Sequence, residues 1–296
     1  MSRAAMVGMV LALATFVFAD PQAPATQNQP ATQGGTAQQG TAPPAPAAQG
    51  KRPPQAKTQP EFDAYNAAVA SANDPAAMEK TANDFATKFP DSELRVLLYR
   101  TAMHSFQSAN NADKMMEMGR SVLKIDPDDP EALVGVAQVL AERTRDTDLD
   151  KDQRLDEAMK LAQRSIETVD TDVAVPAGTP QEKIDAYKGF LRSSAYSIMG
   201  ALQFKKEKFA DAEAYLRKSI DAYPAQPDPV VVLRLALCLD KQDKYPEALK
   251  YANQSLQLAK DNPTLSQLAT NERDRLVQLT SGSSAPAPKP PTPPKN

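Results

Sequence analysis

One acidic stretch has the residue types and spacing of a cation site. From Asp146 to Asp152 an aspartate stands at every second position, and Glu157 closes a span of twelve residues. Carboxylates at alternate positions can point at one cation, as they do in calcium-binding loops. Two features oppose this interpretation, because Lys151 stands where such a loop needs glycine and residues 156–158 fit the start of a helix. We expect a solvated acidic loop, and calcium binding through Asp146–Glu157 is the alternative.

The histidine and cysteine content excludes several kinds of chemistry. One Cys rules out a disulfide framework or a cysteine zinc cluster, and one His rules out a multi-histidine metal site. His104 has no nucleophile and carboxylate partner of the kind that triad catalysis requires. Cys238 lies in the apolar run Leu235–Leu239 with no cation nearby, so we expect a buried, unreactive thiol.

Neighbouring carboxylates give no sign of acid–base chemistry either. Adjacent acidic residues such as Asp128 and Asp129 need a pocket that raises one pKa before they can divide such roles. Without a sign of one, we expect them to form a solvated face. With no glycine-rich phosphate loop, the sequence predicts no enzyme, no cofactor and no metal centre.

Charge and proline content separate the ends of the chain from its middle. Nine of the 26 prolines fall in residues 21–60 and six in residues 286–294, which leaves eleven for residues 61–280. A segment of that length buries roughly 70% of its unfolded surface without a disulfide or metal. Its formal charge is near −8, because the net −3 of the chain includes +3 from residues 1–60 and +2 from the tail. An acidic folded region is a poor nucleic-acid binder, so no nucleic-acid partner is expected.

The first nineteen residues have the pattern of a secretory signal peptide. Arg3 supplies the positive start, residues 4–18 are almost wholly apolar, and Ala19 is a small residue at the expected cleavage site before Asp20. The apolar run of about fifteen residues is shorter than the roughly 20 that span a bilayer. We therefore expect an exported, periplasmic or secreted protein without stable membrane insertion after cleavage. No cysteine follows the run, so acylation as a lipoprotein at that position is excluded.

Two segments have the composition of unstructured chain. Residues 20–60 consist mostly of Pro, Ala, Gln, Thr and Gly, and residues 281–296 of Ser, Pro, Ala and Lys. Such segments bury too little apolar surface to offset the entropy of ordering them. We expect a disordered linker at 20–60 and a disordered tail at 281–296, flanking a folded region at 61–280.

The folded region repeats a helical pattern. Apolar residues recur at spacings of three and four, without sustained alternation, which predicts helices throughout. The clearest copy runs from Tyr196 to Pro224 and has a small residue at Gly200, an aromatic at Phe209 and an alanine at Ala212. Other copies align with it. The residues that open the second helix of each copy are Met78, Met115, Ala158, Ala212 and Ala248.

This pattern resembles the tetratricopeptide repeat (TPR), a pair of antiparallel helices with small residues at the crossing. The resemblance implies an all-α fold, an α-α superhelix of about five helical pairs stacked on one another. Pro263–Thr280 is the expected capping helix. The start signal Thr179-Pro180-Gln181-Glu182 predicts one long helix from Pro180 to about Lys206.

The resemblance also implies a groove lined by the first helix of each pair, where such proteins bind segments of partner proteins. The candidate groove residues are Arg100, His104, Gln107, Gln138, Leu233, Arg234 and Leu237. They do not form the matched Lys, Arg and Asn set with which some family members hold a terminal carboxylate. A helix or extended segment with apolar anchors fits them better. The leading hypothesis is a non-enzymatic protein-interaction scaffold of the cell envelope, and the alternative is a subunit of an envelope or outer-membrane assembly complex.

Overall fold

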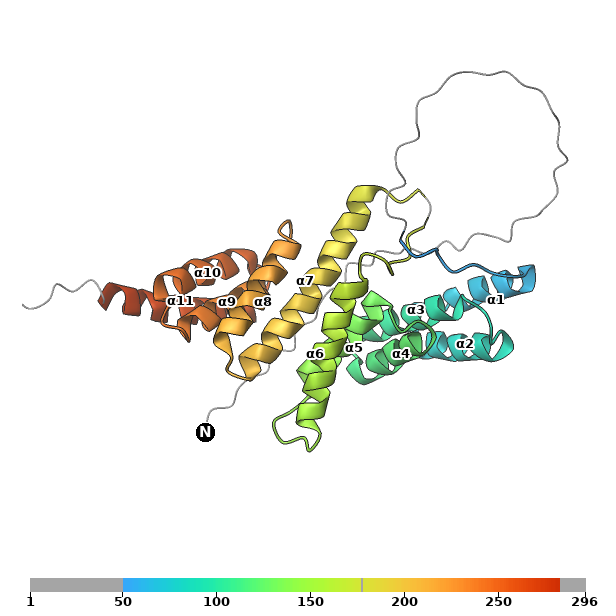
Figure 1. The fold of residues 1–296 in the computed structure, drawn as a ribbon, viewed down its shortest axis with the longest axis horizontal. Coiled ribbons are helices and arrows are strands. Elements are labelled where there is room, and N and C mark those ends of the chain that lie inside the picture. Colours follow the sequence, from blue (N-terminus) through green and yellow to red (C-terminus); the bar gives the residue numbers. More distant parts are fainter. Residues whose placement is uncertain (1–49, 177, 283–296) are drawn as a thin grey trace, which may run out of the picture. The chain divides into compact units, whose positions relative to one another are not determined.

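The computed structural model describes residues 50–176 and 178–282, and over these residues the chain forms eleven α-helices and no strand (Figure 1). The all-α prediction is therefore confirmed. The predicted signal peptide, most of the predicted linker and nearly all of the predicted tail lie outside the described residues. The helices are α1 Gln59–Val69, α2 Pro75–Lys88, α3 Arg95–Ser108, α4 Ala112–Ile125, α5 Pro130–Arg143, α6 Lys151–Thr168, α7 Gln181–Lys205, α8 Phe209–Ala222, α9 Pro229–Asp240, α10 Tyr245–Leu258 and α11 Pro263–Gly282.

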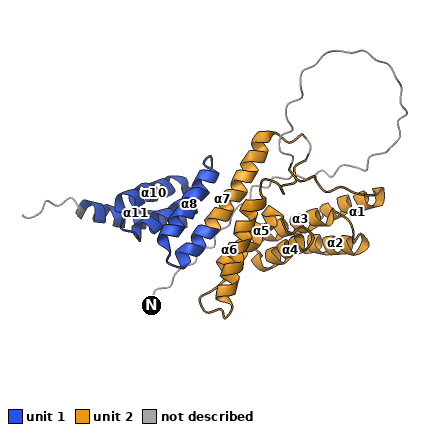
Figure 2. Ribbon diagram, in the orientation of Figure 1, with its two compact units in different colours: residues 1–9, 199–296 blue, residues 10–198 orange. Residues whose placement is uncertain are grey.

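The described chain divides into two compact units, and the division falls inside α7 after Ile198 (Figure 2). Unit 2 holds described residues up to 198, with α1–α6 and most of α7. Unit 1 holds residues 199–282, with the end of α7 and α8–α11.

Successive helices pack on one another within each unit, as a stack of hairpins requires. In unit 2 the contacts run from α1 to α6 in chain order, and in unit 1 they run from α8 to α11. The five residues predicted to open second helices are all buried, at exposures of 5% or less. Small or flexible side chains at these positions let the paired helices approach closely. The repeat prediction is confirmed at these positions.

A serine of the second helix makes the same contact in two of the pairs. Ser165 of α6 donates its hydroxyl to the carbonyl oxygen of Pro130 at 2.9 Å, and Ser255 of α10 donates to Pro229 at 2.8 Å. Both serines are at most 1% exposed, and each proline begins the first helix of its pair. A buried hydroxyl needs such a partner, so this bond fixes how the two helices of a pair are set against each other.

The turn inside a pair also repeats. Asn110, Glu207 and Asp243 each stand two positions before the start of a second helix and have φ between 55° and 59°. The amide that follows each of them donates to a carbonyl five residues back, from Asn111 to Phe106 and from Lys208 to Gln203. This left-handed turn ends one helix and starts the next within a few residues.

Two predicted helices are confirmed. The long helix expected from Pro180 to about Lys206 is α7, which spans Gln181–Lys205. The expected capping helix is α11. Its Leu265 and Ala269 pack on Leu233 of α9, and Leu276 joins the cluster formed by α8, α9 and α10. No helix in the described ranges has the length and apolar character to cross a membrane.

The last part of the predicted linker differs from the expectation. Residues 50–58 lie against unit 2, and α1 begins at Gln59. Lys51 donates its amide to the carbonyl oxygen of Thr171 at 2.8 Å, and Ala56 is buried in the core of α1–α4. Composition missed this segment because its contacts are ion pairs to distant turns and not a local apolar pattern.

Candidate functional site

Unit 2 contains a cavity of about 550 Å³ that opens between the first helices of successive pairs. Its walls come from α1, the turn after α1 with the first residue of α2, α3, α5, α7 and the loop before α7. Apolar side chains form part of the lining, among them Tyr65, Val69, Leu97 and Leu191. A mostly apolar hollow with a few converging polar groups is the usual form of a binding site.

Four charged side chains meet at one side of this cavity. Arg100 and His104 project from α3 one turn apart, while Asp129 and Glu131 stand at the start of α5. Arg100 forms an ion pair with Asp129, and its Nε lies 3.5 Å from Oε2 of Glu131. His104 Nε2 lies 2.5 Å from Oε1 of Glu131. Two residues that are four positions apart on α3 therefore contact two residues that are two positions apart at the start of α5.

Local structure explains why Asp129 lies in this charged cluster. Asp129 is the N-cap of α5, and its Oδ1 accepts the amide of Ala132 at 2.8 Å while Oδ2 accepts from Arg100. A side-chain oxygen that satisfies a free amide at a helix start is a strong local preference. Asp129 is 1% exposed and Glu131 is 8% exposed. The expectation of a solvated acidic face at Asp128 and Asp129 is wrong for Asp129, because the cap and the Arg100 pair bury it.

The charges of this cluster set one another's protonation. Burial alone would raise the pKa of Glu131, but the charge of His104, a hydrogen bond with it, and the charge of Arg100 outweigh burial and lower the pKa to about 2. Burial would lower the pKa of His104, and attraction to Glu131 outweighs it and raises that pKa. Tyr187 of α7 also bonds to Glu131, and burial raises the pKa of Tyr187 further. The cluster therefore holds the ionised carboxylate of Glu131 between Arg100 and His104.

This arrangement has no nucleophile among its charged members. His104 faces a carboxylate, which differs from the expectation of a groove residue without a carboxylate partner, and its side chain is 31% exposed. Arg100 Nε is buried and has no hydrogen-bond partner among the described residues. The cluster can orient a polar ligand group and brace α3 against α5 and α7.

The other candidate groove residues lie elsewhere. Gln107 is half-buried on α3 outside the cavity lining, and Gln138 donates to Glu142 at 3.0 Å on α5. Leu233 was expected in an open groove, but it is 5% exposed because α11 covers it. Leu237 packs on the same cluster, and Arg234 is half-buried near Asp228. Of the candidate set, Arg100 and His104 are the two that come together at the cavity.

The acidic stretch Asp146–Glu157 does not form a calcium loop. The helix α6 begins at Lys151, in the middle of the twelve residues, and Lys151 Nζ lies 2.8 Å from Asp146 Oδ1. Asp148 accepts the amide of Arg145 at 2.9 Å. No group of three His, Cys, Asp or Glu within the described ranges is arranged to hold a metal ion. The predicted solvated loop before a helix describes this segment, and its arrangement gives the calcium alternative no support.

Cys238 has the environment that its apolar neighbours predicted. It is fully buried on α9, its Sγ donates to the carbonyl oxygen of Phe209 at 2.9 Å, and burial raises its pKa to about 11. A thiol in that state is a packing group.

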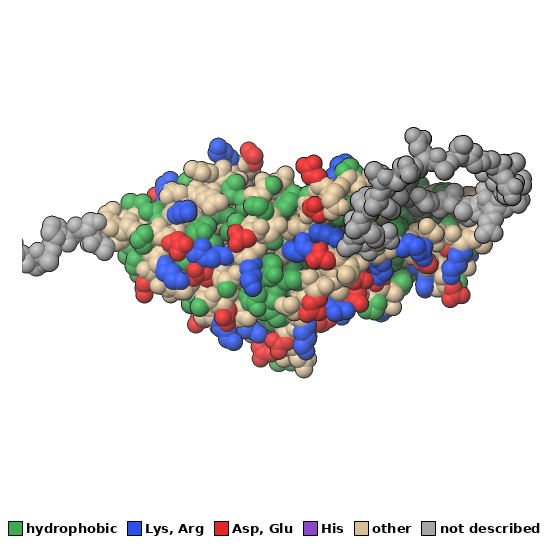
Figure 3. Space-filling model, turned by 45° about the horizontal axis from the view of Figure 1, so that its top comes forward, with side chains coloured by type: hydrophobic (Ala, Val, Ile, Leu, Met, Phe, Trp, Pro, Cys, Tyr) green, Lys and Arg blue, Asp and Glu red, His purple; other side chains and the backbone are tan. Residues whose placement is uncertain are grey.

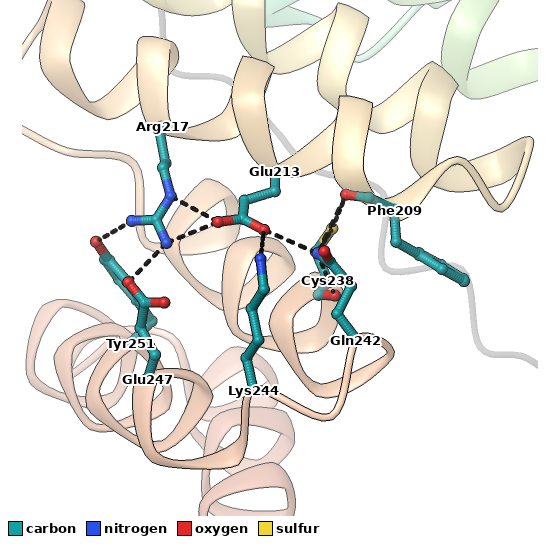
Figure 4. A network of polar contacts seen from close by, with 8 residues as sticks. All are labelled: Phe209, Glu213, Arg217, Cys238, Gln242, Lys244, Glu247 and Tyr251. Carbon is teal, nitrogen blue, oxygen red and sulfur yellow. Dashed lines mark hydrogen bonds and ion pairs between the residues drawn. The ribbon is translucent and has the colours of Figure 1, made fainter.

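Unit 1 has a polar network centred on Glu213 of α8 (Figure 4). Its carboxylate accepts from Arg217 at 2.9 Å, from Gln242 at 2.9 Å and from Lys244 at 2.7 Å. Arg217 also reaches Glu247 at 2.6 Å and the hydroxyl of Tyr251 at 2.9 Å. Because these partners lie on three successive helices or their turns, the network ties α8 to α9 and α10.

The surface face drawn in Figure 3 has Lys and Arg interspersed with Asp and Glu. No large field of one sign dominates that face of the described chain, which differs from the basic stripe of a nucleic-acid binder.

The chain matches no protein-family model and no curated protein. Among solved structures it is similar to TTC0263, a thermophilic TPR protein of Thermus thermophilus, at 12% identity and a TM-score of 0.45, over 72% of this chain and 98% of that one. It is also similar to an assembly chaperone of RpL4 (Acl4, residues 1–338), at 13% identity and a TM-score of 0.42, over 76% of this chain and 98% of that one.

Proposed function

We propose that this chain is a non-enzymatic scaffold that binds a segment of a partner protein in the cavity of unit 2. The observation that carries this proposal is the cavity itself, about 550 Å³ in volume, formed by the first helices of successive pairs. Its apolar wall suits one or two apolar side chains of an extended or helical segment. Arg100 and His104 at its edge suit the polar backbone groups of such a segment.

The charge cluster supports binding better than catalysis. Glu131 is already engaged by His104, Arg100 and Tyr187, so none of these groups is poised to remove a substrate proton. A cluster whose side chains already hold one another in place reorganises little when a ligand binds, which favours affinity.

A bulky side chain at the cavity mouth tests this proposal. Ala109 lines the cavity and is exposed, so Ala109→Trp should fill the opening without disturbing the core. The matched control is Ala76→Trp, at an exposed position on α2 outside the lining. A photo-crosslinker at Ser108 should capture one partner in cells from the wild type and from the Ala76 variant. Capture that persists in the Ala109 variant, or occurs equally from Ser121 on α4, would contradict cavity binding.

We further propose that the protein is exported and acts in the cell envelope, periplasmic or secreted. This rests on the sequence of residues 1–19, with the cleavage site before Asp20. Mass spectrometry of the protein isolated from its own cells should find a mature amino terminus at Asp20. Recovery of residues 1–19 in the isolated protein would contradict export with cleavage.

A further inference from the structure

Residues 50–58 form a strap that crosses three turns of unit 2; Figure 1 draws it in blue before α1. At its start the Nζ of Lys51 lies 2.6 Å from Asp126 and 3.5 Å from Asp172. Next, Arg52 donates to both carboxylate oxygens of Glu93 at 2.8 Å. At its end Lys57 Nζ donates to the carbonyl oxygen of Asp91 at 2.7 Å. Each basic residue of the strap therefore meets a turn between successive helix pairs.

These turns share a sequence feature. Each turn that joins one pair to the next in unit 2 carries two acidic residues with one residue between them. We call this set the acidic turn edge; its members are Asp91, Glu93, Asp126, Asp128, Asp170 and Asp172. Asp128 and Asp170 are paired with Arg164 and Arg192 of the helices, whereas Glu93, Asp126 and Asp172 face the strap.

The strap is bound as an extended ligand would be. Pro53 and Pro54 are half-buried and hold the segment extended, and Ala56 is the strap residue that enters the core. Gly50 approaches so closely that a Cβ there would lie 2.8 Å from the carbonyl oxygen of Val173. The strap thus presents a glycine, two basic residues, two prolines and a further lysine, in that order, along these turns.

The ion pairs of the strap are partly exposed, so a basic segment of another protein can replace them. The side chains of Lys51 and Arg52 are 38% and 58% exposed, and Glu93 is 40% exposed. Ion pairs between exposed groups are individually weak and are screened by salt. The strap backbone adds bonds from the amide of Lys51 to the carbonyl oxygen of Thr171 and from the amide of Gln55 to Oε2 of Glu93 at 3.2 Å.

We infer that the acidic turn edge is a second protein-binding surface, which takes an extended, basic, proline-containing segment of a partner, and that the strap occupies it as an exchangeable internal ligand. The surface borders the cavity, whose lining includes Asp172, but the inference does not depend on the function proposed for the cavity. A partner segment with the same charges binds when it displaces the strap.

The test uses the full-length chain and a labelled peptide with the sequence of residues 50–58, GKRPPQAKT. The strap variant, Lys51→Gln with Arg52→Gln and Lys57→Gln, loosens the internal ligand. Fluorescence anisotropy should show saturable binding to this variant and weaker binding to the wild type. Binding should weaken between about 0.1 M and about 1 M salt, as the Debye length falls from about 10 Å to about 3 Å.

Charge-matched variants locate the binding. In the strap variant, adding Glu93→Gln, Asp126→Asn and Asp172→Asn should weaken peptide binding by roughly tenfold. Neutralising Asp84, Glu142 and Glu182 instead, three exposed acidic residues away from the strap, should leave it unchanged. A peptide with its three basic residues replaced by Gln should not bind. Equal binding by the edge variant and the control variant would overturn the inference.

A second measurement on the wild type guards against a variant that fails to fold. Carbodiimide crosslinking of the peptide should join its lysines to Asp126, Asp172 or Glu93, and crosslinks confined to other carboxylates would overturn the inference. If the wild type sediments as a dimer that the strap variant abolishes, the edge belongs to a second copy and the partner assignment is wrong. The Ala109→Trp variant should bind the peptide as tightly as the wild type does. This result would distinguish binding at the acidic turn edge from binding in the cavity.

Discussion

Gly119 of α4 lies against Val136 of α5 so closely that a Cβ atom on Gly119 would be 2.8 Å from Val136 Cγ2. Valine is stiff at χ1 and cannot move aside easily. We predict that Gly119→Ala destabilises the fold by about 1–3 kcal/mol in urea titrations. Gly135→Ala is the control, because a Cβ there meets the flexible ends of Met115 and Met103 at 3.2 and 3.3 Å. The helix propensity of alanine, worth about 1 kcal/mol over glycine, should offset that contact, and equal losses in the two variants would contradict the close approach.

Loss of Glu131 should be costly. Glu131→Gln leaves Arg100 and His104 in a partly buried site without their shared anion, and removing one partner of a buried pair costs about 3 kcal/mol. Glu142→Gln, on the exposed side of the same helix, should cost less than about 0.5 kcal/mol. Urea titration at neutral pH compares them, and a Glu131 variant as stable as the Glu142 variant would show that the cluster does not brace unit 2.

His104 should make stability depend on pH. Its pKa is raised in the folded chain, because attraction to Glu131 outweighs the opposing effect of burial. The folded state then binds the proton more tightly, so the stabilisation is fully present below the ordinary pKa of about 6.5 and is lost as pH rises through the raised value. The free energy of unfolding should therefore fall as pH rises above about 6.5, the ordinary pKa of histidine. In His104→Gln this fall should be smaller, and an unchanged profile would contradict the assignment.

The network of unit 1 should depend on Glu213 more than on Glu247, although both bind Arg217. Glu213 is 14% exposed and has three partners, whereas Glu247 is 44% exposed. Glu213→Ala should cost about 2 kcal/mol, and Glu247→Ala less than about 1 kcal/mol. Burial would raise the pKa of Glu213, but its hydrogen bonds with Lys244, Arg217 and Gln242 outweigh burial and lower that pKa. The stabilisation that Glu213 gives the fold is therefore present above the ordinary pKa of glutamate and is lost as pH falls through the lowered value. Thermal melts of the two variants at neutral pH make the comparison.

Glu207 occupies a backbone region that suits glycine, with φ at 56°. A side chain there costs about 1 kcal/mol, so Glu207→Gly should raise stability by up to about that amount. Asp243→Gly is the matched change at the equivalent turn. It should gain less, because aspartate tolerates this conformation and Asp243 accepts from the hydroxyl of Tyr245 at 2.5 Å. Differential scanning calorimetry distinguishes the two, and a destabilised Glu207 variant would contradict the strain.

Cys238 should be unreactive until the chain unfolds. With a pKa of about 11 and full burial, its thiolate is present at a fraction of about 10⁻³ at pH 8. Iodoacetamide should leave the native chain unmodified and alkylate it in urea. Rapid labelling of the native chain would show that α9 opens readily.

Periodic apolar residues were enough to predict the helices, because a helix that stacks on a neighbour must repeat its buried face. The residues that open the second helices, the long helix α7 and the capping helix α11 follow from that rule and from local start signals. The buried Cys238 follows for the same reason, since its neighbours are apolar at helical spacing.

The site required the tertiary structure. Glu131 and Tyr187 are 56 residues apart in sequence and carry no motif, and only the packing of α5 beside α3 and α7 brings them to Arg100 and His104. Leu233 has the same apolar character whether it lines an open groove or is covered, and α11 decides that it is covered. The strap pairs Lys51 with residues 75 and 121 positions away. The sequence by itself determined which faces must be buried, because burial depends on local periodicity; the tertiary structure decided which charges meet, because ion pairs depend on distances between segments far apart in the chain.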